Sequence, residues 1–478
     1  MVAALTTFGA LNTSSCIQRK PQRVNYPALF GRCTTSCTKA EVYSGLVICT
    51  AVESDNQHAP SSLAPRVDKV DCGIWNETDE ELVRRSKEDA ENAYNMSLLP
   101  VRSLDEFLKL TGVKEEKLSN MAAKRFNLLG LTLSELKRFS ADIGLPAYRG
   151  KQLRDHIYAG PPVRYIDDLV SLPKATRAAL LAADVHIGRS SVHHVVVDSD
   201  GVVKLLLRLG DDKVIETVGI PSLERGKDRL TACVSSQVGC PMRCTFCATG
   251  KGGFTRNLAP HEIVDQVLSL EEHFGKRVTN VVFMGMGEPL LNTPNVLRAY
   301  TALNTEIGIG ARHITISTVG VRGSLQMLAG ARLQSTLAVS LHAPNQSLRE
   351  VLIPSAKSYP LGELLNDCEQ YFIATGRRVT FEYTLLAGIN DSSEQAVELA
   401  ELLHKKKLAS HVNLIPYNPV HDAPDFARPD RATVFKFKNI LEEMQVPASI
   451  RQSRGLEAAA ACGQLRSSFQ KISPEMSD

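Results

Sequence analysis

Residues 278–318 read VTNVVFMGMGEPLLNTPNVLRAYTALNTEIGIGARHITIST and contain the pattern that decides the fold. The runs VTNVVFMG (278–285) and HITIST (313–318) are short, apolar and rich in β-branched residues, which indicates buried strands. The segment between them, NVLRAYTALNTEIG (295–308), has the apolar spacing of a helix. A strand, a helix and a second strand in succession predict a βαβ unit with two parallel strands.

The same alternation extends over residues 226–460. Four more strands are expected at TACVSS (231–236), STLAVSLH (335–342), VTFEYTLL (379–386) and HVNLIPY (411–417). Four more helices are expected at HEIVDQVLSLEEHFG (261–275), LGELLNDCEQYF (361–372), SEQAVELAELLHKKK (393–407) and ATVFKFKNILEEMQ (432–445). Six units are too few for an eight-fold barrel, so we predict an α/β fold with a partial, six-unit βα barrel. Functional residues of such sheets gather at the carboxyl ends of the strands.

The other segments are assigned by composition and coarse periodicity. The predicted order is a transit peptide (1–60), an N-terminal extension of helical pattern (61–127), a small helical accessory domain (128–190), a short β connector (191–225), the α/β region (226–460) and a C-terminal segment (461–478). The first forty residues hold no Asp or Glu and are basic and rich in Ser, Thr and Ala, as transit peptides are. We expect a chloroplast address, with a mitochondrial address or an untargeted cytoplasmic tail as alternatives.

Composition excludes several classes of protein. Of 478 residues, 43% are hydrophobic and 22% are charged, which excludes bulk disorder. No apolar run approaches the roughly 20 residues of a membrane-spanning helix, so we expect no membrane association. The net charge is only +3, so a nucleic-acid partner must use a local basic patch. Arg149, Lys151 and Arg154 form such a patch, although an ordinary solvated helix face is the simpler interpretation.

Three cysteines follow the first strand of the α/β region. Cys240, Cys244 and Cys247 lie in the motif CPMRCTFC. Because the chain is long and its eleven cysteines are unevenly placed, a secreted disulfide scaffold is excluded. Three thiolates can hold three irons of a cubane cluster and leave the fourth iron open. A structural zinc site with Cys233 as its fourth ligand is the alternative.

The cysteine spacing, with Phe246 before the last cysteine, resembles the radical S-adenosylmethionine (SAM) superfamily. Longer segments resemble the RlmN-type RNA methyltransferases within it: CVSSQVGCPMRCTFCATGKGGFTRNL, VVFMGMGEPLLN, VSLHAPN, NLIPYNP and AACGQL. The resemblance covers about residues 128–466 and implies methylation of carbon 2 of adenine in ribosomal RNA, with transfer RNA as a second substrate of bacterial members. It implies that the accessory domain binds RNA. We also expect a monomer and an electron donor such as ferredoxin or flavodoxin.

The resemblance also implies the cofactors and their ligands. A 4Fe–4S cluster would be bound by Cys240, Cys244 and Cys247, and its open iron would bind SAM. The cofactor pocket would be completed by Gly287, Glu288, Ser317, Ser340, Leu341, His342 and Asn418. Taken singly, most of these would be turn, cap or core residues. Their common placement after predicted strands is what selects them.

Three further residues would carry the reaction. Cys462 matches the cysteine that is itself methylated, Cys233 matches a second, resolving cysteine, and Glu216 matches the proposed proton acceptor. Two SAM molecules would be used per turnover, one to methylate Cys462 and one to generate a radical that takes a hydrogen from that methyl group. The resulting carbon adds to the adenine, and Cys233 releases the product by forming a disulfide. The two cysteines must therefore approach one another.

Two alternatives remain at the level of sequence. A Cfr-type methyltransferase acting on carbon 8 of adenine would share the cluster and both cysteines. The segments GKGGFTRNL and NLIPYNP are closer to the RlmN pattern and favour carbon 2. The second alternative is a non-catalytic, metal-binding RNA assembly factor, in which the metal would be zinc and Cys462 would be dispensable.

Overall fold

The computed structural model describes residues 126–465, apart from 144, 160–162, 183, 225–227, 407 and 421–424. The predicted transit peptide (1–60) lies outside the described residues, as does all of the predicted extension (61–127) except its last two residues. The described residues all belong to the larger of two compact units of the chain, Gly73–Asp478.

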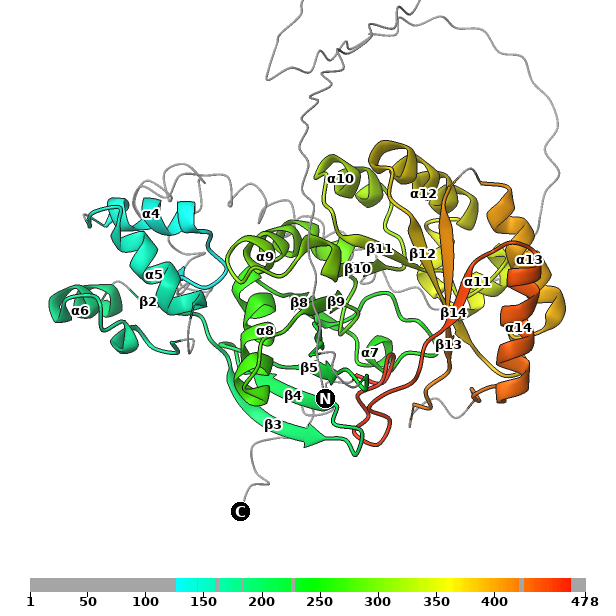
Figure 1. The fold of residues 1–478 in the computed structure, drawn as a ribbon, viewed down its shortest axis with the longest axis horizontal. Coiled ribbons are helices and arrows are strands. Elements are labelled where there is room, and N and C mark those ends of the chain that lie inside the picture. The colour runs from blue at the N-terminus through cyan, green and yellow to red at the C-terminus, as the bar shows by residue number, and fades with distance from the viewer. Residues whose placement is uncertain are drawn as a thin grey trace, which may run out of the picture. The chain divides into compact units, whose positions relative to one another are not determined.

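One ten-stranded sheet organises the described part of the chain (Figure 1). Its parallel strands, in order of adjacency, are β6 (Leu230–Cys233), β9 (Asn280–Phe283), β10 (Ile314–Thr318), β11 (Thr336–Ser340), β12 (Val379–Leu385), β13 (Ser410–Pro416) and β14 (Ala448–Ile450). Beyond β6 the sheet continues as the antiparallel strands β5 (Val214–Pro221), β4 (Val203–Arg208) and β3 (Ser191–Val197). Since β3 and β14 form opposite edges, the sheet stays open, which confirms the predicted partial barrel.

Helices connect the parallel strands and lie along one face of the curved sheet (Figure 1). They are α8 (Pro260–Phe274), α9 (Thr293–Thr305), α10 (Ser324–Gly330), α11 (Gln346–Leu352), α12 (Leu361–Thr375), α13 (Ser393–His404) and α14 (Arg431–Glu443). Short 3-10 helices are η1 (Ile166–Asp168), η2 (Pro289–Asn292), η3 (Ala311–His313) and η4 (Pro354–Lys357). All six predicted strands and all five predicted helices are present. The sequence pattern did not predict β14, α10 or α11, which are too short to show a period.

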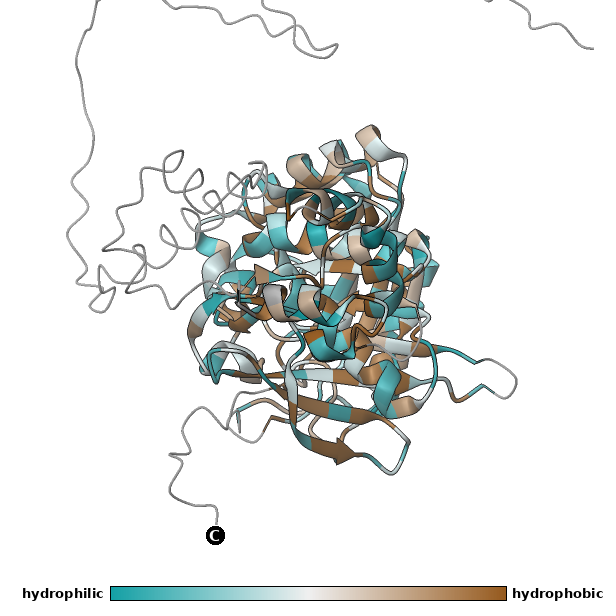
Figure 2. Cartoon of the chain, turned by 90° about the vertical axis from the view of Figure 1, so that its left-hand side faces the viewer, coloured by the Kyte–Doolittle hydropathy of each residue, from teal (hydrophilic) through white to brown (hydrophobic). Residues whose placement is uncertain are grey.

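The apolar pattern explains the layering. Figure 2 shows brown, hydrophobic stretches in the strands, whereas the helices carry both brown and teal faces. The core includes Leu205 and Ile215 of the antiparallel strands and Phe381 of β12, all 0% exposed. Burial removes these apolar side chains from water, which is the main driving force of folding. None of the described helices has the length and apolar character needed to span a membrane.

Residues 126–187 form a small helical element. Strands β1 (Phe126–Asn127) and β2 (Val185–His186) pair in parallel around α4 (Leu133–Asp142), α5 (Arg149–Tyr158) and α6 (Lys174–Ala182). Thr132 caps the N-terminus of α4, and its side chain and that of Glu135 form a capping box. Leu136, Leu153 and Ile157 bury the faces of α4 and α5.

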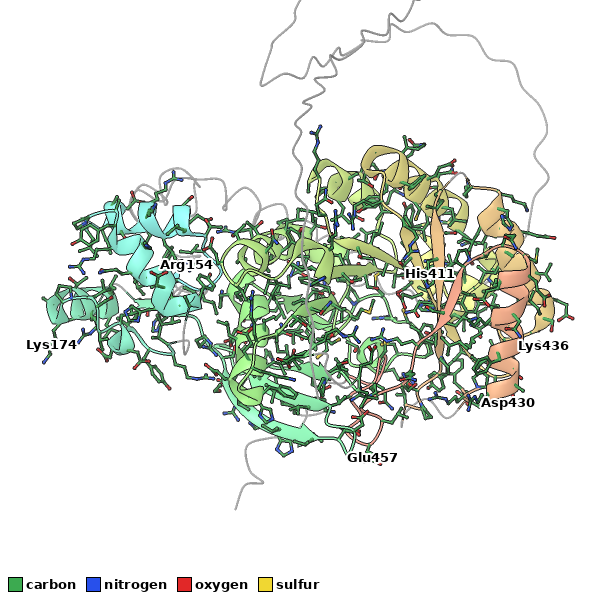
Figure 3. All side chains as sticks on the ribbon, viewed as in Figure 1. Arg154, Lys174, His411, Asp430, Lys436 and Glu457 are labelled. Atoms are coloured by element: carbon green, nitrogen blue, oxygen red, sulfur yellow. The ribbon has the colours of Figure 1, made fainter. Side chains whose placement is uncertain are left out.

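Glu306, at the end of α9, ties this helical element to the α/β region. Its carboxylate accepts hydrogen bonds from the backbone N–H of Leu133 (3.1 Å) and from Nε of Arg154 (3.2 Å). Arg154, labelled in Figure 3, also donates from Nη2 to the Glu306 carbonyl (2.8 Å). Arg154 is therefore engaged within the protein, as is Arg149, which donates to the carbonyl of Ser171. Of the three basic residues that the sequence indicated as an RNA-binding patch, Lys151 is exposed.

Replacing Glu306 with Ala should destabilise this junction. The carboxylate side chain is 6% exposed, so its removal leaves a partly buried guanidinium and a helix N–H without their acceptor. We expect a loss of about 1–3 kcal/mol in the free energy of unfolding, measured by denaturant titration. Glu443→Ala, at an exposed position in α14, is the matched control. Equal stability of the two variants would contradict the role of Glu306.

Candidate active site

A cavity opens at the carboxyl ends of the parallel strands. It contains about 970 Å³ of unfilled space, including the part open to solvent. Ten residues selected from the sequence line it: Cys240, Cys244, Cys247, Gly287, Glu288, Ser317, Ser340, His342, Asn418 and Cys462. The expected convergence of strand ends on one site is therefore what the structure shows. The lining does not include Leu341, Cys233 or Glu216.

The three-cysteine loop is held by backbone contacts on both sides. It runs between β7 (Gln237–Gly239) and α7 (Ala248–Lys251), and β7 pairs with β8 (Phe254–Asn257). Gly239 has φ +81°, and a Cβ atom there would lie 2.0 Å from the carbonyl oxygen of Gly253. Only glycine permits this close approach. On the other side, the N–H of Thr245 donates to the carbonyl of Leu352 in α11 (3.0 Å).

The cysteine loop fits a 4Fe–4S cluster by the chemistry of its donors. Cys244 and Cys247 pack against an apolar cluster that includes Phe246 and Tyr417. Burial, reinforced by the neighbouring thiolates, raises the pKa of Cys240 and of Cys244 well above the ordinary range. Neighbouring thiolates in such surroundings therefore need a positive group among them, and coordinated iron supplies it. Within the described ranges, no three potential ligands are arranged around a single metal ion, whereas a cubane takes one thiolate for each of several irons.

Gly287 and Glu288 follow β9 and enter the cavity as a pair. Gly287 has φ +102°, and a Cβ atom there would lie 2.5 Å from Cβ of Gln237, so this position requires glycine. The Glu288 carboxylate is 2% exposed and accepts from the N–H groups of Leu290 (2.9 Å) and Val319 (2.8 Å). Burial raises its pKa, and these hydrogen bonds counteract that effect. A buried carboxylate at the wall of the cavity is suited to bind an ammonium group.

His342 is held as a neutral hydrogen-bond donor. Its Nδ1 accepts from the N–H of Thr384 (2.9 Å), so the neutral ring carries its proton on Nε2. Burial lowers its pKa to about 3, and the nearby Arg349 guanidinium acts in the same direction. The Phe246 ring packs edge-on against the imidazole, with centroids 4.9 Å apart. Leu341, by contrast, is 0% exposed and lies in the hydrophobic core.

The segment carrying Cys462 is fastened directly to the cysteine loop. The N–H of Ala248, the first residue after Cys247, donates to the carbonyl of Gly463 (2.8 Å). Oγ1 of Thr249 donates to the carbonyl of Leu465 (2.7 Å). Cys462 is exposed and lines the cavity. Its side chain is therefore accessible from the cavity.

Two further clamps position the same segment. Nδ2 of Asn418 donates to the carbonyl of Cys462 (3.0 Å), so this predicted cofactor residue also positions the cysteine. In the β3–β4 hairpin turn, Asp200 accepts hydrogen bonds from Arg454 Nε (2.6 Å) and from the N–H of Gly455 (3.1 Å). Residues 454–465 are thus held at their start by the β3–β4 turn and at their end by α7, which follows the cysteine loop.

Cys233 and Cys462 lie within electrostatic reach of one another. Burial, together with the charge of Cys462, raises the pKa of Cys233 to about 12. Burial also raises the pKa of Cys462, and the Arg451 guanidinium counteracts the effect of burial on both thiols. The two cysteines come from β6 and from the C-terminal segment, and both are free thiols. The two distant cysteines therefore interact electrostatically, as their predicted approach requires, and no disulfide bond joins them.

Glu216, in β5, is connected to the C-terminal segment through a lysine. Its side chain is 4% exposed, and its Oε1 lies 3.8 Å from Nζ of Lys204 on the neighbouring strand β4. Nζ of Lys204 donates to the carbonyl of Ala459 (3.1 Å). Burial lowers the pKa of Lys204, and the charge of Glu216 raises it.

Sequence reasoning missed two buried charged residues. Glu382 lines the cavity from β12 and accepts from Nδ2 of Asn413 (2.8 Å). Lys204 lies in β4 beside Glu216. The available signal was a charged residue inside an apolar strand run, as in VVKLLL and VTFEYTLL. Such residues are rarely buried without a partner.

The pH dependence of the free energy of unfolding should show that His342 is neutral in the folded protein. An unfolded histidine has a pKa of about 6.5, whereas the folded one has a pKa of about 3. Between these values the unfolded state binds a proton that the folded state does not, so the free energy of unfolding falls as the pH is lowered. His342→Gln should reduce this slope by up to about 1.4 kcal/mol per pH unit, measured by denaturant titration between pH 4 and 7. His313→Gln, at an exposed position, is the control, and identical slopes in both variants would contradict the assignment.

Comparison with known proteins agrees with the cavity geometry. The family model of the radical SAM superfamily matches residues 234–403. A crystal structure of a radical SAM methyltransferase from Sphaerobacter thermophilus is 44% identical, with a TM-score of 0.67, and the match covers 72% of this chain and 99% of that chain. Membership of the superfamily implies a 4Fe–4S cluster and SAM.

Two cyanobacterial relatives are more similar in sequence. A probable dual-specificity RNA methyltransferase RlmN from Thermosynechococcus vestitus is 58% identical, and the match covers 71% of this chain and 98% of the relative. Its counterpart from Nostoc punctiforme is 57% identical, with 71% and 93% covered. With such identity over nearly the whole length of these relatives, and with the cysteine loop of the superfamily at the strand ends, the chain belongs to the RlmN family of radical SAM RNA methyltransferases.

Proposed function

We propose that this chain methylates carbon 2 of adenine in ribosomal RNA, with transfer RNA as a second substrate, through a methyl group carried on Cys462. The observation that carries this proposal is the fastening of the Cys462 segment to the cysteine loop, through Ala248 and Gly463 and through Thr249 and Leu465. A thiol in the same cavity as three cluster ligands is where an intermediate methyl carrier is needed. The family name of the relatives and the residues of the cavity favour the same activity.

The cofactors would occupy the cavity through its strand-end residues. Cys240, Cys244 and Cys247 would hold the 4Fe–4S cluster, which when bound supplies the electron that cleaves SAM to a carbon radical. Glu288 is suited to bind the SAM ammonium group, and the Nε2–H of His342 is a donor at the cavity wall. Two SAM molecules would be used per turnover, because one methylates Cys462 and the other supplies the radical.

The chemistry of carbon 2 explains why two cysteines are required. This carbon lies between two ring nitrogens and is electron-poor, so it does not attack an electrophilic sulfonium methyl group directly. A carbon radical on the Cys462 methyl group can add to it. Glu216 would then accept the proton of carbon 2, and the unpaired electron of the adduct would pass to an acceptor such as the oxidised cluster, which leaves a thioether between Cys462 and the base. The Cys233 thiolate would attack the Cys462 sulfur and form a disulfide, the sulfur–carbon bond would break, and the released methylene carbon would take up a proton to become the methyl group. The Arg451 guanidinium, which counteracts the effect of burial on the pKa of both thiols, would favour the thiolate that attacks.

The remaining partners follow from this reaction. An external donor such as ferredoxin or flavodoxin would supply electrons to the cluster, and the active form would be a monomer.

Carbon 8 methylation of the Cfr type would use the same cluster and cysteines. A non-catalytic zinc protein would not need a free thiol fastened beside the cysteine loop, so the position of Cys462 favours the enzyme.

Replacing the two cysteines should have different consequences. Cys462→Ala should abolish RNA methylation, because the acceptor of the first methyl group is lost. Cys233→Ala should still methylate Cys462 and add to the base, but it should not resolve the adduct. We therefore expect a covalent protein–RNA species, seen as a nuclease-sensitive shift on a denaturing gel.

Cys368→Ala is the matched control for these variants. Cys368 is a buried free thiol in α12 that does not line the cavity, and its variant should turn over without trapping RNA. Cluster content measured as iron and sulfide should stay unchanged in all three variants. Wild-type turnover of Cys233→Ala would refute the resolving role, and turnover of Cys462→Ala would refute the methyl carrier.

We further propose that residues 1–60 direct the protein to the chloroplast. The proposal rests on the acid-free, basic and Ser/Thr-rich composition of the first forty residues. A fluorescent protein fused behind residues 1–75 should enter plastids when imaged in plant cells. A diffuse cytosolic signal would overturn the targeting role, and a mitochondrial signal would overturn the choice of organelle.

A further inference from the structure

A buried arginine lies behind the cysteine loop. Arg349 belongs to α11 and is 1% exposed, which makes it one of the largest fully buried side chains in the described part of the protein. A buried cation is costly unless a negative group compensates it. The groups around Arg349 therefore indicate which negative group balances its charge.

The guanidinium has neutral hydrogen-bond partners. Nε donates to the carbonyl of Leu341 (3.3 Å), and Nη2 donates to the carbonyls of Val319 (2.7 Å) and Ser340 (3.4 Å). Among the described residues, no carboxylate forms an ion pair with Arg349, unlike the buried Arg189, which pairs with Asp265. The carbonyls orient the guanidinium at the ends of β10 and β11 but do not neutralise its charge.

The negative group within reach is a cluster ligand. Helix α11 holds the cysteine loop directly, because the carbonyl of Leu352 accepts from both the N–H and Oγ1 of Thr245 (3.0 and 3.2 Å). The Val319 and Ser340 carbonyls that accept from Arg349 belong to residues that line the same cavity as Cys244. Arg349 therefore lies behind the wall of the cavity that holds the cysteine loop, where its charge and the thiolate of Cys244 attract one another.

The other acidic neighbours of Arg349 do not supply a charge. Burial raises the pKa of Cys368 to about 12, so it is a neutral thiol near pH 7. Tyr359, whose pKa is raised by burial, donates its hydroxyl to Asp367 and stays neutral. Cys244 differs because coordination to iron keeps it deprotonated.

We propose that Arg349 is the fixed counter-charge of the iron–sulfur cluster and raises its midpoint potential. The reduced cluster carries one more negative charge than the oxidised cluster, so a nearby buried cation stabilises it more. Net charge, hydrogen bonding and solvent exposure set the potentials of such clusters, and an apolar surrounding strengthens the effect of a single charge. Arg349 is a positioning and tuning residue, and easier reduction would favour electron transfer from the donor. This inference rests on the family's cluster but not on which adenine carbon is methylated.

Two variants separate charge from hydrogen bonding. Arg349→Gln removes the charge and keeps an amide donor, whereas Arg349→Lys keeps the charge and loses the planar fork. The midpoint potential of the reconstituted full chain would be measured without RNA by redox titration, with the reduced cluster followed by electron paramagnetic resonance and with iron and sulfide quantified. Lys357→Gln, which removes an exposed cation from the following helix η4, is the matched control.

We expect a more negative midpoint potential in Arg349→Gln, a smaller shift in Arg349→Lys and no shift in Lys357→Gln. An unchanged potential in Arg349→Gln would overturn the proposal, as would equal shifts in the Gln and Lys variants. Failure of both variants to retain the cluster would assign Arg349 to support of the loop and would also overturn it. If the Arg349 variants shift the potential as expected but the wild type does not methylate RNA, the proposed function is wrong and this inference stands.

Discussion

Thiolates that share one cavity wall repel one another unless a positive group lies among them. Cys240, Cys244 and Cys247 line the same cavity, and burial together with the neighbouring thiolates raises the pKa of the first two. Coordinated iron relieves this repulsion. The architecture around the loop can be understood from this constraint, because each adjoining element either shapes the loop, as Gly239 does, or supplies a charge or donor to it.

The parallel sheet allows distant segments to meet at this loop. Carboxyl ends of neighbouring parallel strands lie at one edge, so short side chains after each strand reach the same cavity. Residues 454–465 also reach this edge of the sheet. The β3–β4 turn holds them through Asp200 and Arg454, and α7 holds them through Thr249. These clamps bring Cys462 beside Cys247 and within electrostatic reach of Cys233. The antiparallel strands are therefore part of the catalytic architecture, in the same sheet as the strands that carry the cofactor residues.

Much of this could be predicted from the sequence, since periodicity and local spacing are local properties. Periodicity predicted the six strands and five helices, and short motifs after the strands predicted ten residues that line the cavity. Residues whose roles depend on long-range packing gave only weak signals. Lys204 and Glu382 appeared as charges within apolar strands, and Arg349 as an ordinary helix residue, because their partners lie far away in the sequence. Leu341 was selected with its neighbours after β11, but backbone alternation turns its side chain into the core. Arg154 looked like a basic surface, yet it pairs with Glu306 at a junction that no local pattern indicates.

The central claim is that this cavity methylates carbon 2 of adenine. The most direct measurement is to incubate the reconstituted protein with SAM, a reductant and unmodified ribosomal RNA, to digest the RNA to nucleosides, and to separate the methyladenosines by liquid chromatography and mass spectrometry. The account predicts 2-methyladenosine, and it predicts none when Cys462→Ala replaces the wild type. Formation of 8-methyladenosine, or of no methyladenosine by a protein with a full cluster, would contradict it.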